Sequence, residues 1–162
     1  MNTNVMFYIL EQEDTSADTL ALVKLQACFQ AAYYYRQNQS VFIYTQDQNQ
    51  AHAIDELLWS FEPDSFVPHN LVGEGPKSGA AVEISWQRPM NRRPILINLT
   101  STVPNFAHQF SQIVDFVPSD EQLKQLARER YKSYRQLGFK VDNQKINQTL
   151  NADQVADDAI NK

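Results

Sequence analysis

The amino-acid sequence predicts a single α/β domain in which a mostly parallel sheet carries helices on both faces. Short, continuous apolar runs, such as residues 5–10 and 41–45, are typical of strands buried on both sides. Longer amphipathic segments alternate with these runs, as expected when helices connect parallel strands. The 162 residues, of which 43% are hydrophobic, suffice for one continuous core.

The first half of the chain contains two strand–helix pairs. The run VMFYIL at residues 5–10 predicts a buried strand, and Thr15 is a candidate cap for a helix that continues to about Arg36. After the polar turn QNQS, residues 41–45 form the next buried apolar run. Apolar residues recur at helical spacing from about 47 to 59, which predicts a second helix.

The middle of the chain combines a long loop with short strands. Residues 61–80 contain three of the seven prolines and three of the four glycines, so this stretch is predicted to be a loop. Strands are predicted at AVEISW (81–86), ILINL (95–99) and QIVDFV (112–117). A short amphipathic helix is expected at about 105–111. The complete order is strand, helix, strand, helix, strand, strand, helix, strand, helix.

The last helix has clear start and stop signals. The Ser119 hydroxyl can cap its first turn, with Gln122 at the third helical position, as in a capping box. Gly138 is expected to end the helix, and Phe139 to pack back against Tyr134. The polar sequence beyond this point predicts a flexible C-terminal tail at residues 141–162, so the folded domain is expected to span residues 1–140.

This helix carries the strongest functional pattern in the sequence. At about 100° per residue, four cations and one phenol fall within an arc of roughly 100°: Lys124, Arg128, Tyr131, Lys132 and Arg135. A separate arc provides the predicted core side: Leu123, Leu126, Ala127, Tyr134 and Leu137. Lysines and arginines often form nothing more than a solvated helix face. A phenol surrounded by cations, however, suits a ligand that is both acidic and apolar.

Charge is distributed unevenly along a chain whose net charge is −5. Residues 1–64 contain nine acids and two bases, whereas residues 65–150 contain seven acids and eleven bases. An acidic protein with one basic sector suits a local anionic ligand better than a long nucleic-acid track. Direct binding of single-stranded DNA therefore stays a secondary alternative. The short apolar run near the N-terminus is neither a signal peptide nor a membrane span, so we expect a cytoplasmic protein.

No motif for catalysis, metal binding or cofactor binding stands out. His52, His69 and His108 lack metal-ligand spacing to one another, and the single cysteine, Cys28, lies in an apolar context typical of a core residue. The GEGPKSG sequence at residues 73–79 has the composition of a phosphate-binding loop but not its glycine spacing. We expect no catalytic site, metal or cofactor. A nucleotide-binding domain or an enzyme on the same α/β scaffold is the rival interpretation.

Two blocks of sequence resemble a known family. These are SFVPHNLVGEGPKSGAAVEISW (65–86) and VDFVPSDEQLKQLARERYKSYRQLGF (114–139), supported by MFYIL near the start and IDELLW at 54–59. Together they resemble the chi subunit of bacterial DNA polymerase III over about residues 5–140. The resemblance implies a non-catalytic α/β accessory subunit of the clamp-loader assembly. It would link the psi subunit to the acidic, phenylalanine-ended tail of single-stranded DNA-binding protein.

The resemblance also implies roles for individual residues. The tail-binding positions of the family match Trp59 and the basic helix face: Lys124, Arg128, Tyr131, Lys132 and Arg135. Its psi-binding positions match Phe66 and Val117. Judged by residue type alone, the large apolar side chains among these would more often be core residues. The stretch from His69 to Gly75 also matches the family, without an evident chemical role. The tail after residue 141 departs from the family pattern.

Overall fold

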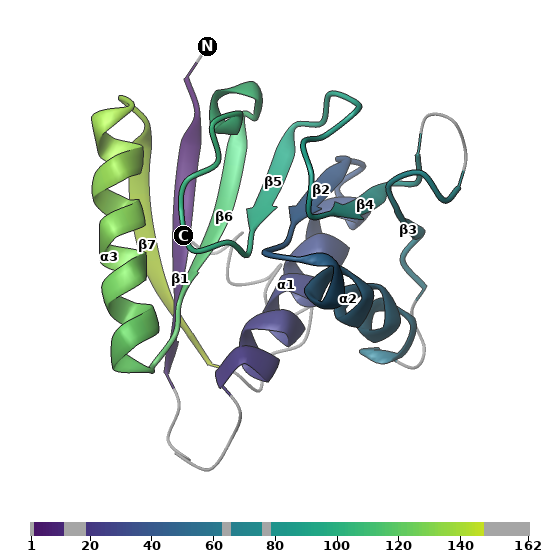
Figure 1. Ribbon diagram of the computed structural model, residues 1–162, viewed down its shortest axis with the longest axis horizontal. Coiled ribbons are helices and arrows are strands. Elements are labelled where there is room, and N and C mark those ends of the chain that lie inside the picture. The colour runs from purple at the N-terminus through teal and green to yellow at the C-terminus, as the bar shows by residue number, and fades with distance from the viewer. Residues whose placement is uncertain (1, 12–18, 63–65, 76–78, 148–162) are drawn as a thin grey trace.

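The computed structural model describes residues 2–11, 19–62, 66–75 and 79–147, and contains one sheet of seven parallel strands in the order β3-β4-β2-β5-β6-β1-β7 (Figure 1). The strands are β1 (Asn4–Glu11), β2 (Val41–Tyr44), β3 (His69–Leu71), β4 (Val82–Ser85), β5 (Ile95–Asn98), β6 (Gln112–Val117) and β7 (Lys140–Asn147). All six pairings between neighbouring strands are parallel. The predicted α/β class with a mostly parallel sheet is confirmed.

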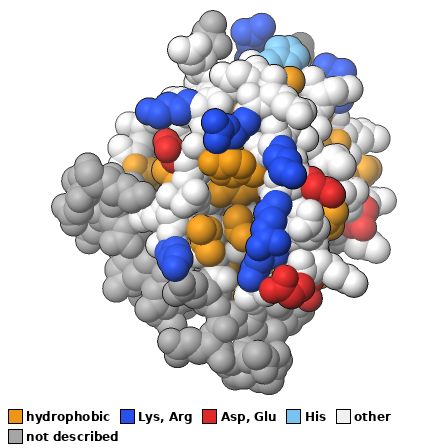
Figure 2. All heavy atoms as spheres, turned by 90° about the vertical axis from the view of Figure 1, so that its left-hand side faces the viewer, with side chains coloured by type: hydrophobic (Ala, Val, Ile, Leu, Met, Phe, Trp, Pro, Cys, Tyr) orange, Lys and Arg blue, Asp and Glu red, His pale blue; other side chains and the backbone are white. Residues whose placement is uncertain are grey.

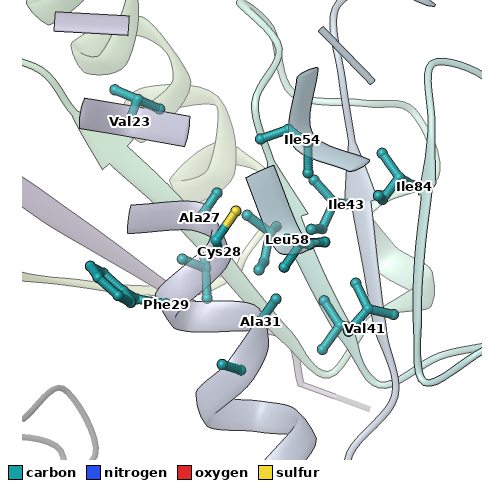
Figure 3. Packing of buried hydrophobic residues seen from close by; sticks show 14 of the residues in the cluster. Val23, Ala27, Cys28, Phe29, Ala31, Val41, Ile43, Ile54, Leu58 and Ile84 are labelled. Carbon is teal, nitrogen blue, oxygen red and sulfur yellow. The ribbon is translucent and has the colours of Figure 1, made fainter. Parts of the chain in front are cut away.

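Helices lie on both faces of the sheet. Helices α1 (Thr19–Arg36) and α2 (Gln48–Ser60) pack on one face, and α3 (Glu121–Gln136) packs on the other. On the first face, Cys28 lies among side chains of both helices and of β2, including Leu58 and Ile43 (Figure 3). Cys28 is fully buried, as expected for a core cysteine. On the second face, α3 covers Phe7 of β1 through Tyr131 and Tyr134, at ring-centroid distances of 5.6 and 5.7 Å.

Three predicted local features differ in the structure. Only a single 3-10 turn (Ala107–Gln109) forms where a short helix was expected. The long loop contains the three-residue strand β3, which is too short to produce a periodic signal. Asp120 rather than Ser119 caps α3, because the Asp120 carboxylate accepts a hydrogen bond from the Leu123 N–H at 3.0 Å. The candidate cap Thr15 lies outside the described residues.

The boundary of the C-terminal tail also needs correction. Residues 140–147 form β7, which pairs with the whole of β1, from Asn4 opposite Lys140 to Glu11 opposite Asn147. Val141 packs on the α3 side and Ile146 on the α1 side, so β7 contributes to both halves of the core. Its other residues are polar because β7 is an edge strand, where charged side chains are common. Residues 148–162 lie outside the described part of the chain.

Among the described residues, no helix is both long and apolar enough to cross a membrane.

Candidate functional site

The basic face of α3 is the first candidate surface. Its residues are Lys124, Arg128, Tyr131, Lys132 and Arg135, as predicted from helical spacing. Figure 2 shows the side of the molecule on which α3 lies, where lysine and arginine side chains surround an apolar surface. Tyr131 is half-buried against Phe7, while the guanidinium of Arg135 lies 6.0 Å from the centre of its ring. The phenol is therefore held in place and bordered by positive charge.

The cations of this face are only partly neutralised. Lys124 lies 3.4 Å from Glu121, an acid one helical turn earlier, so its charge is partly compensated. The Arg128 guanidinium donates to the Gln125 side-chain oxygen at 3.4 Å. Within the described residues, Arg128, Lys132 and Arg135 have no acidic partner. Three exposed cations beside one ring remain available to an acidic ligand.

The predicted core side of α3 is confirmed in part. Ala127 and Tyr134 are buried, Leu123 and Leu126 are half-buried, and Leu137 is 56% exposed. Arg130, which was not among the predicted core residues, is buried and only 8% exposed. Its charge is compatible with burial because it faces a buried carboxylate on β6.

Asp115 of β6 is the partner of Arg130. The Arg130 Nε lies 3.0 Å from Oδ2 and its Nη2 lies 3.0 Å from Oδ1, and the Tyr134 hydroxyl donates to Oδ2 at 2.9 Å. Burial raises the pKa of Asp115, while the Arg130 guanidinium acts in the opposite direction. Sequence reasoning missed this pair. Its signal was a single acid, Asp115, within the apolar run IVDFV of β6, because a buried acid requires a buried partner.

The second candidate surface is formed by Trp59 of α2 and Phe66 before β3. Their side chains are exposed, at 60% and 59%, and their ring centroids lie 5.5 Å apart. Trp59 also packs edge-on against His69, with ring centroids 4.7 Å apart. His69 is buried and held by the Val67 and Asp55 carbonyl oxygens, at 2.7 and 3.1 Å from its ring nitrogens. Two large exposed aromatic side chains on a rigid base are typical of a protein interface.

The structure corrects how the predicted residues are grouped. Trp59 was assigned together with the basic helix face, but it lies beside Phe66 at the β3 end of the sheet, whereas α3 lies at the β7 end and on the opposite face (Figure 1). Val117 was assigned together with Phe66, but it packs against the same apolar cluster as Tyr131. In the structure Trp59 thus lies with Phe66, and Val117 packs on the side of the sheet that α3 covers.

The rival nucleotide-binding interpretation gains no support from the glycine-containing loop. Residues 72–81 lead from β3 to β4, and their described part contains no helix. A phosphate-binding loop needs a following helix, whose N-terminal N–H groups hold the phosphate. Asn70 instead holds the loop by accepting from the Ala80 N–H at 2.7 Å. Residues 76–78, which include Lys77, lie outside the described residues.

A crevice of about 440 Å³ lies at the carboxyl edge of the sheet, where parallel α/β proteins commonly bind ligands. Its polar wall includes Asp115 and Arg130, which already bind each other. No group of three or more His, Cys, Asp or Glu side chains within the described residues could hold a metal ion. The buried ion pair in this wall is therefore already satisfied, while Lys24 and Asp47 also line the crevice.

Together, the parallel sheet and the two exposed surfaces define an α/β domain suited to contacts with other macromolecules. The chain belongs to the family of DNA polymerase III chi subunits, since the model of that family, described as DNA polymerase III chi subunit, HolC, matches residues 2–142. As a member of this family it has an accessory role in DNA replication.

Three relatives named DNA polymerase III subunit chi agree with this assignment. The one from Escherichia coli (strain K12) is 48% identical over 86% of this chain and 95% of its own. Those from Haemophilus influenzae and Pseudomonas aeruginosa are 43% and 32% identical, over 90% and 89% of this chain and 99% and 97% of theirs.

The fold also resembles that of a solved structure outside the family. T4 UvsW matches 91% of this chain with a TM-score of 0.59 and 10% sequence identity, while this chain covers 42% of T4 UvsW. At that identity the likeness concerns the fold alone.

Proposed function

We propose that this protein is a non-catalytic, cytoplasmic adaptor of the DNA polymerase III holoenzyme. It holds the psi subunit of the clamp loader with one surface and the acidic tail of single-stranded DNA-binding protein with the other. The observation that carries the proposal is the presence of two exposed surfaces of different chemistry at opposite ends of one sheet. Their separation lets both partners bind at the same time.

The basic face of α3 fits the acidic tail. Arg128 and Lys124 would meet carboxylates, while Tyr131, together with Val117 packed against the same apolar cluster, would border the terminal phenylalanine ring. Lys132 and Arg135 extend the positive charge along the helix. Charge-assisted hydrogen bonds contribute roughly 1.5 to 3 kcal/mol each, so two or three of them with one buried ring support micromolar affinity.

The Trp59–Phe66 surface fits the psi subunit. It is apolar and aromatic, as the centres of lasting subunit interfaces tend to be. His69 supports Trp59 from below, so the ring pair is already ordered before a partner binds. Pre-ordered aromatic side chains lose little entropy on binding and often dominate the binding free energy.

The tail site can be tested by titrating a labelled acidic peptide ending in phenylalanine. Arg128→Glu should weaken binding at least about tenfold, because a favourable charge contact becomes a repulsive one. Arg92→Glu makes the same charge change at an exposed position in the β4–β5 loop, outside α3, and should leave the affinity nearly unchanged. Equal affinities for Arg128→Glu and wild type would exclude this assignment.

The psi site can be tested by co-purification. Phe66→Ala and Trp59→Ala should each strongly reduce the amount of psi retained, whereas Val117→Ala should not. Met90→Ala provides the control, since Met90 is 79% exposed and lies in the β4–β5 loop. Wild-type recovery of psi with both aromatic variants would contradict the proposal.

The rival interpretations have inexpensive tests. A nucleotide-binding domain would gain thermal stability with nucleotides, because a ligand that binds only the folded state raises the melting temperature. We expect no such shift. Direct binding of single-stranded DNA would be detected with labelled DNA in the absence of the coating protein. Strong, salt-sensitive binding there would favour a nucleic-acid role for the basic sector.

A further inference from the structure

The segment that follows β7 has the same chemistry as the ligand proposed for the α3 surface. Residues 148–162 contain three acids, Asp153, Asp157 and Asp158, and one base, Lys162. Larger apolar side chains are interspersed among them, namely Leu150, Val155 and Ile160. The segment is thus both acidic and apolar, which are the two properties that the ring and cations of α3 favour. The family model ends at residue 142, before this segment begins.

The topology brings the start of this segment close to the basic face. Helix α3 follows β6 and leads into β7, so it begins at the carboxyl edge of the sheet and runs back across it. Strand β7 runs parallel to β1 and returns to that same edge, ending at Asn147 opposite Glu11. Helix α3 and β7 pack against each other. The chain therefore leaves the sheet at the end where Lys124 and Arg128 lie.

Chain length places the whole basic face within reach. The helix rises about 17 Å from Lys124 to Arg135, at about 1.5 Å per residue. Fifteen residues can extend to about 50 Å. A tethered segment of this length has an effective concentration on the order of millimolar at a nearby site. Contacts too weak to hold a free peptide would consequently be populated within the chain.

The face also has charge left to bind. Among the described residues only Lys124 has an acidic side chain within 4 Å, and that acid, Glu121, is 82% exposed and screened by water. Arg128, Lys132 and Arg135 lack a described acidic partner. We propose that residues 148–162 bind the basic face of α3 as an intramolecular ligand and compete there with the external acidic tail. This inference rests on the proposed function of that face.

The experiment compares the affinity of a labelled acidic, phenylalanine-ended peptide for three full-domain proteins. They are the whole chain, a chain ending at Asn147, and the full-length triple variant Asp153→Asn, Asp157→Asn and Asp158→Asn. Both altered proteins should bind about threefold to tenfold more tightly than the whole chain, because the competitor is absent or uncharged. Asp142→Asn is the control. It removes an exposed acid of β7, and we expect no gain in affinity.

A second readout does not depend on the external peptide. The amide signals of α3 in NMR spectra should differ between the whole chain and the chain ending at Asn147, with the largest shifts at Arg128, Tyr131 and Lys132. Adding the 148–162 peptide to the shortened chain should restore them. Unchanged spectra together with equal peptide affinities would overturn the inference. If the acidic peptide binds none of the proteins but the spectra respond, the proposed external ligand fails while the intramolecular contact stands.

Discussion

Single residues decide whether charge can be buried in this sheet. The clearest case is the pair formed by Glu83 of β4 and Arg93 before β5, with Nη2 to Oε1 at 2.7 Å and both side chains nearly inaccessible. Gly79 has a φ of +80°, and an added Cβ there would overlap the Glu83 carboxylate. The glycine is thus required twice, by its backbone conformation and by the ion pair beside it.

Replacing Gly79 therefore has a specific expected cost. Gly79→Ala should reduce the free energy of unfolding by roughly 2–4 kcal/mol, since it strains the backbone and displaces a buried ion pair. Gly73→Ala is the matched control, because Gly73 has a φ of +93° but nothing within 4 Å of an added Cβ. It should cost only about 1 kcal/mol. Urea denaturation of the two variants measures the difference, and equal losses would refute the role of the ion pair.

A second residue-scale prediction concerns stability at alkaline pH. Burial raises the pKa of Tyr8 to about 12, above its ordinary value of 10.0. Between these values the unfolded chain loses the proton while the folded protein keeps it, so stability is complete below pH 10 and falls as pH rises toward 12. The loss should approach about 3 kcal/mol by pH 12 and be roughly half of that at pH 11. Urea midpoints at pH 9 and 11 measure it, and Tyr8→Phe should show a distinctly smaller decrease.

At the scale of one element, α3 has two functions on different sides. Arg130 faces the sheet and is bound by Asp115, and this contact fixes how the helix is rotated. That rotation turns Tyr131 onto Phe7 and leaves Arg128 exposed. Packing of the helix on the sheet hence depends on Arg130, while ligand binding depends on Arg128, two residues earlier.

The same substitution at these two arginines should have opposite effects. Arg130→Met leaves Asp115 buried without its cation, so unfolding should become easier by about 3–5 kcal/mol. Arg128→Met should change stability by less than about 0.5 kcal/mol but weaken binding of the acidic peptide. Thermal denaturation and peptide titration of both variants provide the measurements. An Arg130→Met protein as stable as wild type would disprove the structural role of the buried pair.

At the scale of the whole molecule, the two surfaces lie at opposite ends and on opposite faces of one sheet. The central strands β2, β5 and β6 are buried on both sides and separate them with a rigid core. No single short peptide can contact both surfaces. Binding at the two should accordingly be independent and differ in its physical basis.

Salt should distinguish the two surfaces. Raising the salt concentration from 50 to 500 mM should weaken binding of the acidic peptide to α3 by roughly tenfold, because exposed charges are screened. Retention of psi on the Trp59–Phe66 surface should change little, because the contact there is apolar. Fluorescence titration and co-purification at both salt concentrations provide the comparison. A similar loss of both partners would show that one surface, or one kind of interaction, serves both.

The amino-acid sequence by itself determined the class of fold and the basic face. Continuous apolar runs located β1, β2 and β6, since strands buried on both sides need no polar alternation. Helical spacing alone gathered Arg128 and Tyr131 on one side of α3, because that geometry is local. The polar edge strand β7 escaped detection because its stability comes from pairing with β1 rather than from its own residues.

Only the tertiary structure decided which distant residues share a surface. Trp59 lies beside Phe66 rather than beside α3, and Val117 packs on the α3 side of the sheet, because neighbours across a sheet depend on strand order, which no local pattern encodes. Arg130 was revealed as a core residue for the same reason: its partner, Asp115, is 15 residues away on β6. Helical spacing in the sequence thus predicted the chemistry of the basic face, whereas the order of the strands determined which residues lie beside it.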